Sequence, residues 1–241
     1  SLDGYLEVNQ VQLQLEEPEV SMTDLSGRLN FEGNRVAIER LTGTINGGAL
    51  EAGGAFAYES GALRDVSIEA NARDFFIEYP EGLQLGMSAD LQLRSAERDQ
   101  LLLAGRVGIS EGAYTRSFGI WTEMLNQFRG DDDSGLIKEE QPSLSRLNLR
   151  IDIDTEQPIV FDNNLAQVLV VTDLRLTGTL DRPGLTGRLN VLEGGEIYLQ
   201  ERDYLVERGT VTFVNETSIE PVLDVEARTQ VGDNEITLQL T

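Results

Sequence analysis

Apolar and polar residues alternate along most of the chain, and this pattern limits the fold more than any other feature. Val11, Leu13 and Leu15 are separated by glutamines, and the same period of two recurs at intervals as far as Leu240. Such a period places alternate side chains on one face of a β-strand. Antiparallel strands with one face in water follow this pattern, whereas buried parallel strands are apolar throughout. The sequence therefore predicts an all-β, mostly antiparallel protein.

Turn residues separate the alternating runs. All six prolines lie between runs or at their edges, where a missing N–H costs no ladder hydrogen bond. Segments such as Asn46-Gly47-Gly48 and Gly232-Asp233-Asn234 have the composition of tight turns. Counting the runs predicts about 15 to 17 strands at the usual spacing.

Glycine recurs on the apolar side of several runs, within the phrase apolar–polar–Gly–polar–apolar. The phrase is centred on Gly27, Gly43, Gly105, Gly178 and Gly187. Glycine weakens a strand interior, so its repeated use indicates a sharply bent sheet or a need for space on that face.

A single sheet of about 15 strands would be roughly 70 Å across, and open sheets of this size curl, split or close. A sandwich, a closed barrel and one sheet folded lengthwise into a trough all remain open on this ground. The alternating apolar positions are mostly small or aliphatic, which suits a groove for acyl chains. An ordinary sandwich core has the same composition.

One stretch departs from the alternation. Trp121, Met124, Leu125 and Phe128 have the spacing of a short amphipathic helix, and an acidic, loop-like segment follows them. Residues 116–146 are therefore expected to form a helical and acidic insertion. They separate an N-terminal β block, residues 1–115, from a C-terminal β block, residues 147–241. We expect the two blocks to form one continuous unit within a longer protein.

The composition excludes several functions. A net charge of −23 leaves no basic surface for nucleic acid. Histidine and cysteine are absent, which excludes Ser-His-Asp and Cys-His catalysis, zinc sites built on Cys or His, haem and iron–sulfur clusters. We expect no enzyme activity, no catalytic residue, no cofactor and no metal. Asp131–Asp133 with Asp152 and Asp154 allow a calcium site, but a solvated acidic face explains them better.

The segment 174–225 carries the most specific motifs, in a fixed order. They are Gly178-Thr-Leu180, Pro183-Gly-Leu-Thr-Gly187, Gly194-Gly195-Glu-Ile197-Tyr198, Gly209-Thr-Val211-Thr-Phe213 and Pro221-Val-Leu223-Asp-Val225. This series resembles the C-terminal periplasmic region of the TamB family, the translocation and assembly module subunit, within the AsmA-like bridge-type lipid transfer proteins. Residues 25–50 are similar to the repetitive β region that lies upstream in that family.

The resemblance implies a fold, a location and partners. The fold would be an elongated, mostly antiparallel sheet folded lengthwise into a β-taco-like trough with a hydrophobic groove. The protein would lie in the periplasm, anchored to the inner membrane by an N-terminal helix absent here. It would carry phospholipids between the inner and outer membranes, with an Omp85-class, TamA-like outer-membrane barrel as partner. A scaffold that aids outer-membrane protein assembly is the alternative, and a surface β adhesin is a third.

Under this hypothesis the apolar positions of the central and C-terminal strands line the groove and bind lipid. These are Val107, Ile109, Leu149, Ile151, Leu176, Leu180, Leu189, Val191, Ile197, Leu199, Val211, Phe213, Leu223 and Val225. Whether they share one face depends on strand register, which the alternation alone does not determine.

Overall fold

The computed structural model describes residues 2–15, 19–59, 62–97, 100–117, 146–200 and 202–240. The predicted helix over Trp121–Phe128, most of the predicted 116–146 insertion and the Asp131–Asp133 run lie outside these residues. Within the described ranges, no helix has the length and apolar character needed to span a bilayer.

The described residues form fifteen strands, as the alternation predicts. They are β1 (Leu2–Leu15), β2 (Val20–Gly33), β3 (Arg35–Ile45), β4 (Gly48–Glu59), β5 (Ala62–Glu78), β6 (Leu83–Ser95), β7 (Leu101–Tyr114), β8 (Leu147–Thr155), β9 (Ile159–Asp162), β10 (Ala166–Gly178), β11 (Pro183–Val191), β12 (Glu196–Leu199), β13 (Arg202–Asn215), β14 (Pro221–Val231) and β15 (Asn234–Leu240).

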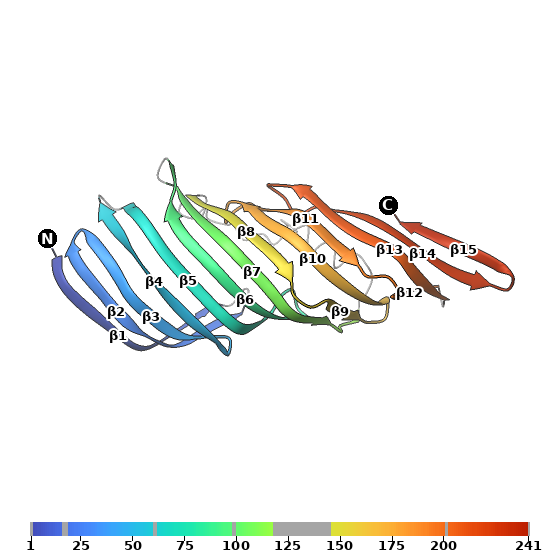
Figure 1. Ribbon diagram of the computed structural model, residues 1–241, viewed down its shortest axis with the longest axis horizontal. Coiled ribbons are helices and arrows are strands. Elements are labelled where there is room, and N and C mark those ends of the chain that lie inside the picture. Colours follow the sequence, from blue (N-terminus) through green and yellow to red (C-terminus); the bar gives the residue numbers. More distant parts are fainter. Residues whose placement is uncertain are drawn as a thin grey trace, which may run out of the picture.

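All fifteen strands belong to one long sheet, in which neighbours in sequence are mostly neighbours in space (Figure 1). The pairings are antiparallel except those of β7 with β8 and with β9, which are parallel. Strand β9 continues the line of β8 between β7 and β10, and β12 continues the line of β11 between β10 and β13. The all-β, mostly antiparallel fold is thus confirmed, and thirteen strand positions at about 4.8 Å each give a sheet roughly 60 Å across.

The ladder pairings divide the side chains between two faces, because directly paired residues point to the same side of a sheet. One face, called the apolar face below, carries the apolar positions of the alternation; the other is the polar face. One row crosses the apolar face from β1 to β11 without a break. It consists of Val8, Gly27, Leu41, Ala52, Ala70, Leu91, Gly105, Ile151, Leu176 and Leu185.

A line of backbone irregularities crosses the sheet from β5 to β13. It is called the crease below, and it comprises Arg73–Asp74, Ser110, residues 156–158, residues 192–195 and Glu207. In β5, β7 and β13 an extra residue interrupts the ladder, whereas β8 and β11 stop at the crease and β9 and β12 resume beyond it. Extra residues of this kind bend a strand and increase its twist. The strands of the N-terminal half, which have further register shifts in β1–β4, are curved rather than straight (Figure 1).

Two glycines of the repeated phrase occupy positions that only glycine fits. Gly105 in β7 and Gly187 in β11 have φ of 151° and 115°, values that side chains disfavour. A Cβ atom at Gly105 would overlap the carbonyl oxygen of Asp90, and one at Gly187 would overlap that of Asp173. Both glycines therefore let a neighbouring strand approach closely, which agrees with the prediction of a bent sheet.

Candidate functional site

The apolar face is the candidate site, and it brings together nearly all of the predicted groove residues. Ladder pairings place Val107, Ile109, Leu149, Ile151, Leu176, Leu189, Val191, Ile197, Leu199, Val211, Phe213, Leu223 and Val225 on it. Leu180 is the exception, because it lies in the turn between β10 and β11, where no ladder pairing assigns it a face. Sequence spacing alone places Leu180 on the apolar side, but the left-handed backbone of Gly178 (φ 78°) interrupts the strand just before it.

These side chains differ in exposure along the face. Ile109, Leu149, Ile151 and Phe213 are buried, while most of the others are half-buried. Leu223 is 40% exposed although it lies on the apolar face of β14. A single sheet whose apolar side chains remain partly in water presents an extended surface for an apolar ligand.

Several well-buried residues of the apolar face lie along the crease. Phe75, Ile109, Ile159, Val170 and Val206 all lie beside it and are at most 7% exposed. Except for Ile109, sequence reasoning missed them as site residues. The available signals were the turn residues Pro158 and Gly194-Gly195, which mark the two strand breaks. Along the crease the apolar face is therefore covered by the protein itself, as it also is at Leu25 and Val66.

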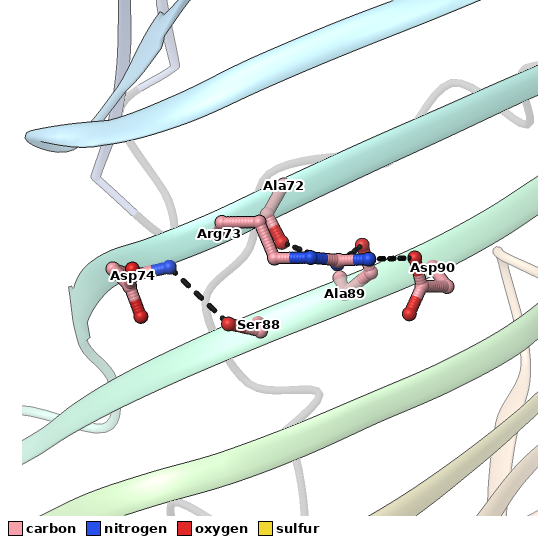
Figure 2. A network of polar contacts seen from close by, with 6 residues as sticks. All are labelled: Ala72, Arg73, Asp74, Ser88, Ala89 and Asp90. Atoms are coloured by element: carbon pink, nitrogen blue, oxygen red, sulfur yellow. Dashed lines mark hydrogen bonds and ion pairs between the residues drawn. The ribbon is translucent and has the colours of Figure 1, made fainter.

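Polar side chains replace the ladder hydrogen bonds that the crease disrupts in β5 (Figure 2). Arg73 Nη1 donates to the carbonyl oxygens of Ala72 and Ala89, at 3.0 Å each. Its Nη2 pairs with Asp90 on the polar face, and the backbone N–H of Asp74 donates to Ser88 Oγ at 3.2 Å. The guanidinium thus joins β5 to β6 where the backbone does not, which fixes the local bend.

Asn46 performs a similar role at the tip of the β3–β4 hairpin. Its Oδ1 accepts from the N–H of Ser21 at 2.7 Å. Its Nδ2 donates to the carbonyl oxygens of Glu19 and Phe76, at 3.0 and 2.8 Å. The side chain therefore joins the start of β2 to the end of β5 across the hairpin tip, where β3 and β4 have already turned back.

Two threonines, Thr155 and Thr172, interrupt the apolar face at the crease. Thr172 is 8% exposed, and its Oγ1 is buried without a hydrogen-bond partner among the described residues. Its backbone N–H donates to Thr155 Oγ1 at 3.0 Å. A buried hydroxyl without a partner lowers stability.

The polar face is organised by ion pairs between neighbouring strands. Arg175 Nε contacts Asp152 at 2.6 Å and Arg106 contacts Asp154 at 3.7 Å. The hydrogen bond to Asp152 also raises the pKa of Arg175. These two aspartates, considered above as calcium ligands, are therefore partners of arginines. Within the described residues, no group of three or more Asp or Glu side chains is arranged to hold a metal ion.

The comparisons with known proteins agree with the resemblance seen in the sequence. A family model described as "TamB C-terminal domain" matches residues 39–241, from β3 to the end of the chain. No curated protein matches the chain.

Proposed function

Because the chain belongs to the TamB family, we propose that it is a segment of a periplasmic bridge that carries phospholipids between the inner and outer membranes. The family acts in translocation and assembly, as a transport module rather than an enzyme, and it works with a TamA-type partner. Our proposal is that the crease folds the apolar face into a trough that holds acyl chains. The continuous apolar face of a single sheet is the observation that carries it.

The dimensions of the sheet support this proposal. On one side of the crease, β9 and β12 each have four residues, which is about 13 Å of strand. On the other side, β8 and β11 each have nine residues, or about 30 Å. One leaflet of a bilayer has a hydrocarbon depth of about 15 Å. The longer wall is therefore deep enough to cover an acyl chain while headgroups remain in water, and the shorter wall covers most of its length.

The energetics allow movement as well as binding. Burial contributes about 0.8 kcal/mol per CH₂, so one acyl chain gains on the order of 10 kcal/mol relative to water. A bilayer offers a similar gain, so transfer between membrane and trough is nearly level in free energy. Adjacent strands present similar apolar side chains about 4.8 Å apart. An acyl chain that moves by one strand therefore replaces its contacts with equivalent ones.

Two neighbouring residues of β14 provide a matched test. Leu223 lies on the apolar face and is 40% exposed, whereas Val222 lies on the polar face and is 56% exposed. Leu223→Glu and Val222→Glu therefore add the same charge at exposed positions that tolerate it. Native mass spectrometry with lipid extraction should detect phospholipid on wild type and on Val222→Glu, and much less on Leu223→Glu. Folded wild-type protein without lipid would contradict the proposal.

A second candidate function has one observation in its favour. Strands β1 and β15 are outermost in the sheet, and an outermost strand has backbone groups free to pair with another strand. A scaffold for outer-membrane proteins would use such edges and would tolerate Leu223→Glu. It would fail instead when the edges are blocked, for example by proline at alternate positions of β15. The two variants thus separate lipid carriage from strand pairing.

A further inference from the structure

A second apolar surface lies on the polar face, where β9, β10, β12 and β13 meet. Val160, Leu169 and Leu205 are 39%, 43% and 40% exposed, and half-buried Tyr198 lies on the same face. Val160 is paired directly with Leu169, while Leu205 follows two strands further on. These four residues, called the outer patch, are on the side of the sheet opposite to the proposed trough, so lipid carriage does not account for them.

Carboxylates surround the outer patch on the same face. Asp162 and Glu196 are both paired with Gln167 of β10, and Asp203 is paired with Tyr198. Their proximity has an electrostatic effect on the ring hydroxyl. Desolvation raises the pKa of Tyr198, and the charges of Glu196, Asp203 and Asp162 raise it further. The outer patch therefore lies in a negative potential.

Several other carboxylates of the polar face are neutralised by arginines. Glu7, Glu51, Asp90 and Asp152 each contact an arginine of a neighbouring strand. In the part of the chain that the structure describes, no Lys or Arg side chain forms an ion pair with Asp162, Glu196 or Asp203. Their charge is thus available to a partner from outside.

We propose that the outer patch docks a basic amphipathic segment of a partner protein, with aliphatic side chains on Val160, Leu169 and Leu205 and lysines or arginines on the surrounding carboxylates. A protein segment fits better than a bare cation, because a cation gains nothing from the three aliphatic residues. An anionic lipid surface is repelled by the same carboxylates. The inference is independent of lipid carriage, which uses the other face.

The test uses the full chain and an 18-residue peptide of Leu and Lys at helical spacing, labelled for fluorescence anisotropy. The patch variant is Asp162→Asn, Glu196→Gln and Asp203→Asn combined. The control variant is Glu32→Gln, Glu59→Gln and Glu69→Gln combined, which removes three exposed charges from the N-terminal half of the same face. Measurement at about 0.15 M salt screens long-range attraction to the whole acidic chain.

We expect the three substitutions of the patch variant to weaken peptide binding about tenfold, and those of the control variant to weaken it less than about threefold. Leu169→Ser should also weaken binding, and a peptide with Ser in place of Leu should bind the wild-type chain poorly. Equal losses in the two charge variants would overturn the proposal in favour of general electrostatic attraction. If Leu223→Glu lost peptide binding and the patch variant did not, the peptide would lie on the apolar face, and the proposal would be overturned. Calcium binding without peptide binding would indicate a cation site and would overturn it as well.

Discussion

Two adjoining regions of the sheet, β5–β7 and β8–β12, cross the crease by different means. Strands β5 and β7 continue through the crease with one extra residue each, β6 passes it without one, and polar side chains replace the missing ladder bonds of β5. Arg73, Ser88 and Asn46 have this role. In the next region β8 and β11 stop at the crease, β9 and β12 resume beyond it, and β10 runs through unbroken. Here the backbone itself makes the connecting bonds. The N–H of residue 156 donates to the carbonyl oxygen of Ile109, and that of residue 192 donates to the carbonyl oxygen of Leu169.

This difference indicates where each half is sensitive to substitution. A bend completed by side chains depends on a few residue types that alternation does not reveal. A bend whose hydrogen bonds come from the backbone depends on interruptions between strands, and such connecting segments tolerate most side chains. We therefore expect side-chain substitutions near the crease to act mainly on the N-terminal half. Glycines at close strand contacts occur in both halves, so substitutions of these glycines should not differ between the halves.

The largest effect is expected from the glycines, and it should be equal in the two halves. Gly105→Ala and Gly187→Ala each place a Cβ against a backbone carbonyl at a φ that alanine disfavours, so each should lower the free energy of unfolding by about 3 kcal/mol. Gly53→Ala is the control, because the nearest atom to its Cβ would be 3.6 Å away. Urea unfolding measures all three, and a change as large for Gly53→Ala would contradict the argument.

Asn46→Ala should have the next largest effect, confined to the N-terminal half. It removes three hydrogen bonds to backbone groups of Glu19, Ser21 and Phe76, at a cost of about 2 kcal/mol. Hydrogen exchange should increase at Ser21 and Phe76 and remain unchanged beyond β8. Asn46→Gly keeps the positive φ of 42° accessible and loses only the side-chain bonds. If the glycine variant matches wild type, the hydrogen bonds do not matter.

The next comparison is between one arginine of each half, and it measures the free energy of unfolding of Arg73→Met and of Arg175→Met. Arg73 binds two backbone carbonyls of the crease as well as Asp90, so its loss should cost about 1 kcal/mol and speed exchange around Ala72–Phe75. Arg175 contacts Asp152 on the open polar face, so its loss should have a smaller effect on unfolding. Equal losses would show that the crease in β5 gains nothing from the guanidinium.

The smallest effect concerns Tyr198 in the C-terminal half. Burial and nearby carboxylates raise its pKa in the folded state. Its contribution to stability is therefore complete below the unfolded value near 10 and is lost as pH rises through the folded value. Glu196→Gln should lower the midpoint of the phenolate absorbance change at alkaline pH, with Tyr198→Phe identifying the signal. An unchanged midpoint would show that Glu196 does not act on the ring hydroxyl.

Alternation predicts the class of fold and most of the apolar face, because a period of two survives as long as strands are regular. It fails where an extra residue changes the phase. Phe75 and Phe76 are adjacent aromatics, yet Phe75 is 5% and Phe76 is 55% exposed, since the extra residue at Asp74 determines which of them faces inward. The backbone partners of Asn46 and Arg73 are contacts between distant segments, and composition alone does not indicate them.

The parallel pairing of β7 with β8 has a consequence for how the chain assembles. Most other pairings join strands separated by a short turn, such as the two residues between β3 and β4. Tyr114 and Leu147, by contrast, are separated by 32 residues, and closing a loop of that length costs about 2.5 kcal/mol more than closing a two-residue turn. We therefore expect the hairpins of each half to form first. The pairing of β7 with β8, which joins the halves, should be the slow step of folding.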